Sequence, residues 1–112
     1  MPNTIPQTTT MIDWEHKNVI ASKNSFANYG FMFGGTNHNL EEIKALDEKK
    51  VPALKLFLGS STGNMLINNQ EVLKEIFKST NLVIAVHCED EDIINKNLIE
   101  AKKKFGENIP MS

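Results

Sequence analysis

Short apolar runs alternate along this chain with stretches of helical periodicity, and this alternation constrains the fold more than any other feature. Strand-like runs occupy residues 29–34, 53–58 and 82–86, and helices are predicted over 11–26, 40–50 and 70–79 and from the acids at 90–92 to Gly106. Strands that alternate with helices of about ten to fifteen residues are typical of a parallel sheet. The sequence therefore predicts an α/β fold whose strands lie in chain order.

The two later apolar runs divide their residues unequally between the two faces of a strand. Leucines share one face of the 53–58 run, and Lys55 lies on the other face. Branched residues likewise share one face of the 82–87 run, and His87 lies opposite them. A (β/α)₈ barrel has this division, with functional groups near the C-terminal strand ends, whereas a doubly wound sheet predicts no such asymmetry. We therefore predict part of a TIM-like (β/α)₈ barrel.

Lys55 interrupts an apolar strand, where burial of an ammonium group costs several kcal/mol. One interpretation is structural: the side chain reaches out of the strand end or meets a carboxylate. The alternatives are a Schiff-base lysine and a carbamylated lysine that bridges two metal ions, both of which gain from a lowered amine pKa.

His87 ends the next strand on the same side as Lys55. A single histidine is more often structural than a metal ligand, but neighbouring parallel strands lie only about 4.8 Å apart. A lysine and a histidine placed in this way could share a metal, and imidazole and carboxylate ligands suit zinc.

Other polar features receive simpler interpretations. The glycine- and serine-rich loop at 59–64 lacks the P-loop lysine, and the acids at 89–92 suit the N-terminus of a helix. His16 and His38 are expected to be exposed. We expect Cys88, which has the opposite strand parity to His87, to be a buried structural thiol rather than a nucleophile.

Composition excludes several classes of function. Twelve lysines, no arginine and fourteen acids give a net charge of −2, which argues against a nucleic-acid-binding surface. No apolar run approaches the ~20 residues that span a bilayer, and no signal peptide is visible at the N-terminus. A single cysteine fits a reducing compartment, so we expect a cytoplasmic protein without membrane partners.

Three segments, taken together, resemble one enzyme family. Residues 1–9, Met-Pro-Asn-Thr-Ile-Pro-Gln-Thr-Thr, are similar to the Met-Pro-Asn-Thr-x-Pro-x-Thr-Thr segment of bacterial dihydroorotases, and this is the most specific match. Residues 53–58, Ala-Leu-Lys-Leu-Phe-Leu, resemble the strand that carries their carbamylated lysine. Residues 83–89, Val-Ile-Ala-Val-His-Cys-Glu, resemble the following strand, which ends in a metal-binding histidine. The two strands are shared with hydantoinases and allantoinases and so indicate the wider amidohydrolase superfamily.

The resemblance implies a metal-dependent cyclic amidase, a hydrolase that interconverts carbamoyl-aspartate and dihydroorotate in pyrimidine biosynthesis. It implies that Lys55, as a carbamate, bridges two zinc ions and that His87 binds one of them. It also implies that Asn3 helps to hold the carboxylate of this small-molecule substrate, beside an arginine that this chain lacks.

The chain also departs from the family pattern. It has no His-x-His motif, and the family's later metal-binding histidine and catalytic aspartate have no counterpart, so we assign no catalytic residue within residues 1–112. A (β/α)₈ barrel takes at least ~200 residues. We therefore interpret residues 1–112 as an internal fragment of a single amidohydrolase barrel domain, about from the end of strand 2 to helix 5, and expect it to be inactive by itself.

Two alternatives stay open. The first is a related cyclic amidase, an allantoinase or a hydantoinase. The second is a free-standing small α/β binding module, against which the uncovered strand edges argue. The sequence leaves the oligomeric state undetermined.

Overall fold

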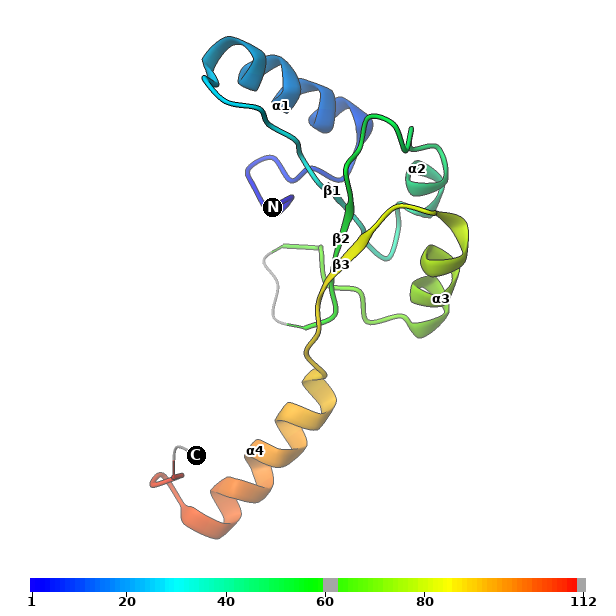
Figure 1. Ribbon diagram of the computed structural model, residues 1–112. Helices are drawn as coiled ribbons and strands as arrows, with labels where there is room; N and C mark the ends of the chain where they lie inside the picture. Colours follow the sequence, from blue (N-terminus) through cyan, green and yellow to red (C-terminus); the bar gives the residue numbers. More distant parts are fainter. Residues whose placement is uncertain (60–62, 111–112) are drawn as a thin grey trace.

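A three-stranded parallel sheet organises the chain, as the computed structural model shows for residues 1–59 and 63–110 (Figure 1). The strands β1 (Phe33–Gly34), β2 (Leu54–Phe57) and β3 (Ile84–His87) lie in the order β1-β2-β3. The helices are α1 (Met11–Asn24), α2 (Leu40–Lys44), α3 (Gln70–Ser79) and α4 (Glu91–Phe105). The predicted parallel order of the strands is confirmed.

The core lies between one face of the sheet and the helices that follow β1 and β2. Leu54 and Leu56 of β2 are fully buried and cluster with Ile43 of α2 and Ile76 of α3. Ile84 and Val86 of β3 pack against the same cluster, while Ala53 and Phe57 are buried outside it. The branched face of each strand therefore meets the helices, as the alternation of side chains predicted.

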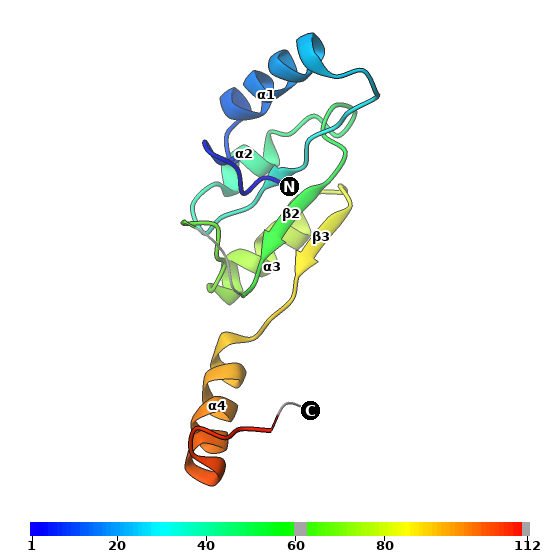
Figure 2. The ribbon, with the colours of Figure 1, turned by 90° about the vertical axis from the view of Figure 1, so that its left-hand side faces the viewer.

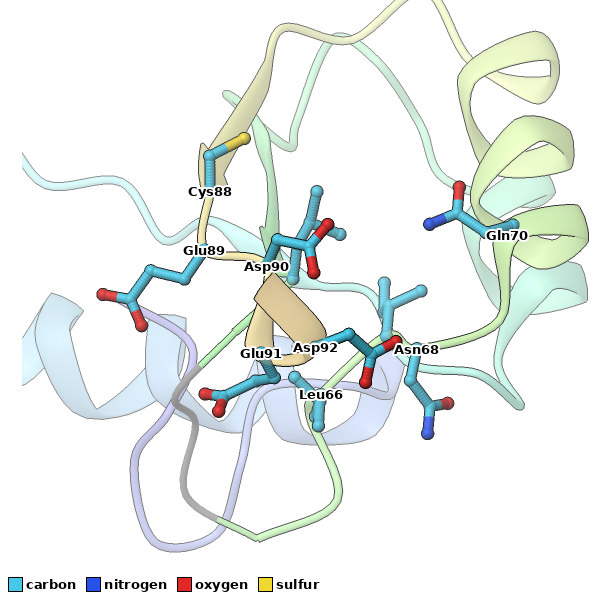
Figure 3. A pocket seen from close by; sticks show the side chains of 10 residues that line it. Leu66, Asn68, Gln70, Cys88, Glu89, Asp90, Glu91 and Asp92 are labelled. Atoms are coloured by element: carbon cyan, nitrogen blue, oxygen red, sulfur yellow. The ribbon is translucent and has the colours of Figure 1, made fainter. Parts of the chain in front are cut away.

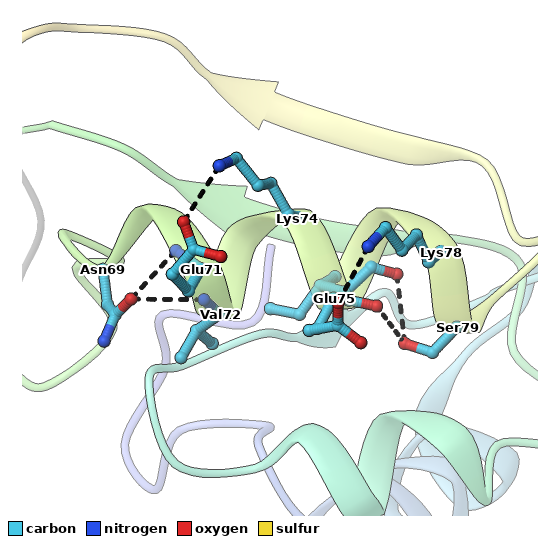
Figure 4. A network of polar contacts seen from close by, with 8 residues as sticks. Asn69, Glu71, Val72, Lys74, Glu75, Lys78 and Ser79 are labelled. Atoms are coloured by element: carbon cyan, nitrogen blue, oxygen red, sulfur yellow. Dashed lines mark hydrogen bonds and ion pairs between the residues drawn. The ribbon is translucent and has the colours of Figure 1, made fainter.

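The helix α3 begins and ends where the sequence predicted. The side chain of Asn69 caps it by accepting hydrogen bonds from the backbone N–H groups of Glu71 and Val72, at 3.0 and 3.2 Å. On its exposed side, ion pairs join Lys74 to Glu71 and Lys78 to Glu75 (Figure 4). Exposed pairs of this kind contribute little, so the cap and the buried face of the helix define its position.

Several predicted elements have different bounds in the structure. The strand predicted at 29–34 is only Phe33–Gly34, and its described ladder with β2 covers just two residue pairs. The helix predicted at 40–50 ends at Lys44, since the side chain of Asp47 accepts a hydrogen bond from the N–H of Lys49 and forms a turn. The predicted strand at 82–86 is shifted to Ile84–His87.

The helix α1 ends at Asn24 rather than at residue 26 and does not bury the stripe that the sequence indicated. Ile12, Val19 and Ile20 are exposed, and Trp14 is the buried residue of this helix. Its indole N–H donates to the Phe31 carbonyl at 2.8 Å. Burial of the Trp14 ring in the core and this long-range bond, rather than the predicted stripe, hold α1 against the segment before β1.

The helix α4 extends away from the sheet and its covering helices (Figures 1 and 2). None of its residues is buried, and Gly106 ends it with a positive φ of 63°. Ile93, Ile94, Leu98 and Ile99 are exposed along it. In the described part of the chain, no helix is long and apolar enough to cross a membrane.

Candidate metal centre

Lys55 and His87 share one face of the sheet. In the parallel ladder, Lys55 is paired with Ala85, and Phe57 is paired with His87, two residues further along both strands. The Phe57 ring lies between the two polar groups, with its centroid 4.5 Å from Lys55 Nζ and 5.9 Å from the centroid of the imidazole. The period-two prediction that Lys55 and His87 project from the same face is therefore confirmed.

The Lys55 amine is enclosed in the protein. The residue is 6% exposed, and Nζ donates a hydrogen bond to the Leu56 carbonyl at 3.2 Å. Burial lowers the pKa of the Lys55 ammonium below its usual 10.5, while the nearby Cys88 acts in the opposite direction. The amine is therefore easier to deprotonate than a surface lysine.

His87 lies at the C-terminal end of β3 and remains accessible. Its side chain is 45% exposed, and its Nε2 is 3.3 Å from Oε1 of Glu89. The Phe57 ring packs beside the imidazole at an angle of 56°. One side of the ring is therefore supported by the protein, while part of it stays open to solvent.

Asn3 lies in a different cavity. It is exposed and lines a space of about 560 Å³ together with residues 4–7 and Gly63. Lys55 and His87 are not among the described residues that line this space. The structure therefore brings the lysine and the histidine together but does not join Asn3 to them.

A second cavity, of about 350 Å³, opens beyond the C-terminal ends of β2 and β3 (Figure 3). It is lined by Leu58, Leu66, Ile67, Asn68, Gln70, Cys88, Glu89, Asp90, Glu91 and Asp92. Asp90 caps α4 by accepting a hydrogen bond from the N–H of Ile93 at 3.0 Å, so the helix-terminus interpretation of the acids is supported. Among the described residues, no three His, Cys, Asp or Glu side chains converge in a way that could hold a metal.

The prediction that Cys88 is buried is wrong. The thiol is exposed, because Cys88 follows the last residue of β3 and lines the open cavity, where strand parity no longer sets its direction. His16 and His38 are exposed, as predicted. The loop interpretation of residues 59–64 falls partly on residues 60–62, which lie outside the described residues.

Sequence reasoning did not single out two neighbours of the predicted ligands. Phe57 packs between Lys55 and His87, and Glu89 meets the imidazole. The parity of β2 placed Phe57 on the lysine face. Parity would have placed Glu89 on the histidine face only if the strand had continued, and β3 ends at His87. A contact between side chains cannot be read from parity.

Comparisons with known proteins agree with the predicted resemblance. No family model matches the chain. Dihydroorotases of Methanosarcina acetivorans and Methanosarcina mazei are each 37% identical over 94 residues, which is 80% of this chain and 20% of each relative. The dihydroorotase of Methanosphaera stadtmanae is 27% identical over 103 residues, covering 92% of this chain and 23% of that protein. The chain thus spans about a fifth of the length of its curated relatives.

A solved structure matches the fold. The L-hydantoinase (dihydropyrimidinase) from Arthrobacter aurescens superimposes with a TM-score of 0.80 and 29% sequence identity. The match covers 95% of this chain and 24% of that one. The predicted resemblance to dihydroorotases and the predicted fold class, an α/β portion of a TIM-like barrel, are both confirmed.

Proposed function

We propose that this chain supplies the bridging lysine and one metal-binding histidine of a zinc-dependent cyclic amidase, and that the enzyme is a dihydroorotase. One observation carries the proposal: a buried amine, Lys55, and an accessible imidazole, His87, share one face of adjacent parallel strands. Barrel enzymes carry their functional groups at the C-terminal ends of such strands. The 37% identity to archaeal dihydroorotases over 94 residues supports this choice of reaction.

The proposed modification of Lys55 is a carbamate. The neutral Nζ attacks the carbon of carbon dioxide, an N–C bond forms, one C=O π pair moves to oxygen, and the nitrogen loses a proton. The lowered pKa of Lys55 favours this step because a larger fraction of the amine is neutral. The Leu56 carbonyl and the Phe57 ring restrict where the modified side chain can lie.

The donor types fit a zinc centre. A carbamate oxygen and an imidazole nitrogen are both ligands that zinc accepts. Bound zinc supplies Lewis acidity toward an amide carbonyl and lowers the pKa of a water molecule. Lys55 and His87 give two protein ligands, whereas a catalytic zinc usually has three, so the proposed centre includes further donors besides this pair.

The proposed substrates are the small molecules dihydroorotate and carbamoyl-aspartate, in a cytoplasmic reaction. Both carry carboxylates, and this chain has no arginine to bind them. The Asn3 carboxamide can donate an N–H bond to a carboxylate oxygen, and its exposed position leaves it free to meet a ligand. The proposal of Asn3 for substrate binding rests on the resemblance of residues 1–4 to the Met-Pro-Asn-Thr segment of dihydroorotases.

A hydantoinase is the second candidate. The fold matches an L-hydantoinase over 95% of the chain, and Lys55 and His87 suit either enzyme. Dihydroorotase is preferred because of the curated relatives and the Met-Pro-Asn-Thr segment at residues 1–4. A substrate panel of dihydroorotate, hydantoin and allantoin, assayed with the intact protein that carries this chain, separates the candidates.

Substitution of the lysine tests the proposal. In the intact protein, Lys55→Ala should abolish binding of two zinc ions and dihydroorotase activity, whereas Lys50→Ala, on an exposed turn, should change neither. Short carboxylic acids should partly restore the Lys55→Ala variant because they can replace the carbamate. An alanine variant that kept its metals and its full rate would limit Lys55 to a structural role. The 112-residue chain by itself should show no turnover, since two ligands do not complete a catalytic zinc site.

A further inference from the structure

The helix α4 carries an apolar seam along one side. Ile94, Leu98, Ala101 and Phe105 follow one another at spacings of four, three and four residues. At 3.6 residues per turn, these side chains lie one above the other on a single face of the helix. Ile94, Leu98 and Phe105 are 44%, 44% and 41% exposed, and no residue of α4 is buried. We call these four residues the α4 seam.

The direction of α4 leaves this seam uncovered. The helices α2 and α3 lie on the sheet, whereas α4 extends away from the C-terminal end of β3 (Figures 1 and 2). The cap by Asp90 and the lysines of the last turn support α4 only at its ends. A helix of about 15 residues is marginal in water unless an apolar face is packed. Alternate spacings of four and three residues are those of a two-helix coiled coil, so the seam fits a second helix.

The charges of α4 indicate which helix fits. Acids occupy residues 90–92 at its N-terminal end, and lysines occupy residues 102–104 in its last turn. Within residues 1–59 and 63–110, none of these three lysines forms an ion pair. An antiparallel helix of the same sequence brings lysines beside acids at both ends of the pair. A parallel copy instead brings acids beside acids and lysines beside lysines, which is unfavourable.

We propose that two copies of this chain associate through their α4 seams, with the two helices antiparallel. A twofold axis across the middle of the pair brings Leu98 of each copy to Ala101 of the other, and Ile94 to Phe105. The seam is shorter than standard interfaces, which bury about 800 Å² per partner, so the dimer is weak and reversible. This inference concerns α4 and does not rest on the proposed function.

Sedimentation equilibrium of the 112-residue chain, over about a hundredfold range of concentration, measures the association. The chain should pass from monomer to dimer in this range. Leu98→Asn should weaken association about tenfold or more, because it removes an apolar side chain of the seam from each copy. Ile99→Asn is the matched control, since Ile99 is exposed about 100° further round the helix. It should change association less than about twofold.

Charge reversal tests the pairing of the helix ends. One variant replaces Lys102, Lys103 and Lys104 by glutamate, and a second carries Glu91→Lys and Asp92→Lys. Each variant by itself should stay monomeric, because like charges then meet at both ends of an antiparallel pair. An equimolar mixture should form a heterodimer, since every end again pairs opposite charges. Absence of a heterodimer in the mixture would overturn the assigned charge pairing.

The orientation can be measured through Cys88, the single cysteine of the chain, which is exposed just before α4. Nitroxide labels on Cys88 of an antiparallel pair lie at opposite ends of a 15-residue helix, more than about 20 Å apart. A parallel pair would bring them to about 10 Å, the separation of two packed helices. Pulsed electron resonance should therefore give the longer distance. The shorter distance, a chain that stays monomeric throughout, or a dimer that Leu98→Asn leaves intact would each overturn the inference.

Discussion

Replacement of Lys55 by methionine should make the folded chain more stable at neutral pH. Lys55 is 6% exposed, and within residues 1–59 and 63–110 no carboxylate forms an ion pair with it. Burial of an ammonium group costs several kcal/mol. Methionine keeps the unbranched apolar stem and removes the charge, so the substitution removes this cost without opening a large cavity.

The size of the effect follows from the contacts of Nζ. The hydrogen bond from the charged Lys55 Nζ to the Leu56 carbonyl stabilises the folded chain by about 1.5–3 kcal/mol. The contact of Nζ with the Phe57 ring stabilises it by about 0.5–2 kcal/mol. These contributions offset most but not all of the burial cost. We therefore expect Lys55→Met to raise the free energy of unfolding by about 1–2 kcal/mol.

The stability gained by Lys55→Met should decrease as the pH rises. The pKa of Lys55 is lowered in the folded chain, so the unfolded chain binds more protons between the folded pKa and 10.5. The cost is fully present below the folded pKa and disappears as the pH rises through this window. The advantage of Lys55→Met should therefore shrink as the pH approaches 10.5.

Urea unfolding followed by far-UV circular dichroism and by the fluorescence of the buried Trp14 measures both effects. Lys96→Met, at an exposed position of α4, is the matched control and should change stability by less than about 0.5 kcal/mol at every pH. The reasoning is refuted if Lys55→Met destabilises the chain, or if its advantage is the same at neutral and alkaline pH.

Three further substitutions test the scaffold by the same unfolding measurement. Asn39→Ala should lower the free energy of unfolding by about 2–3 kcal/mol. The Asn39 side chain donates to the Thr9 and Gly34 carbonyls and accepts from the Thr36 N–H. A loss below about 1 kcal/mol, the contribution of one hydrogen bond, would contradict this prediction. Gly35→Ala should lower the free energy of unfolding by about 1–3 kcal/mol, because the added Cβ would overlap the buried Leu56 side chain. An unchanged stability would contradict this prediction and would mean that the Leu56 side chain can repack. Asn69→Ala should lower the free energy of unfolding by about 1 kcal/mol through loss of the α3 cap (Figure 4). The control Asn97→Ala, at an exposed position in the middle of α4, should cause no loss of stability. Equal effects of the two substitutions would refute the capping argument.

Local chemistry in the sequence determined the order of the elements and the face on which each strand residue lies. Side chains alternate across a strand whatever the rest of the chain does, so Lys55 and His87 could be assigned to one face before any contact was known. The bounds of α3 were equally local, because Asn69 supplies its own cap and the apolar spacing of the helix supplies its buried face.

Only the tertiary structure decided what depends on partners distant in the sequence. The N–H of Gly34 in β1 bonds the carbonyl of Thr8, 26 positions earlier in the chain. Ile12, Val19 and Ile20 stay exposed because no described element covers them. Cys88 is exposed because strand parity ends with His87. Gly59, in the segment after β2, likewise lies close to Glu89, which is 3.3 Å from the imidazole of His87. Periodicity gives the direction of a side chain, whereas burial and contact depend on which segments pack against it.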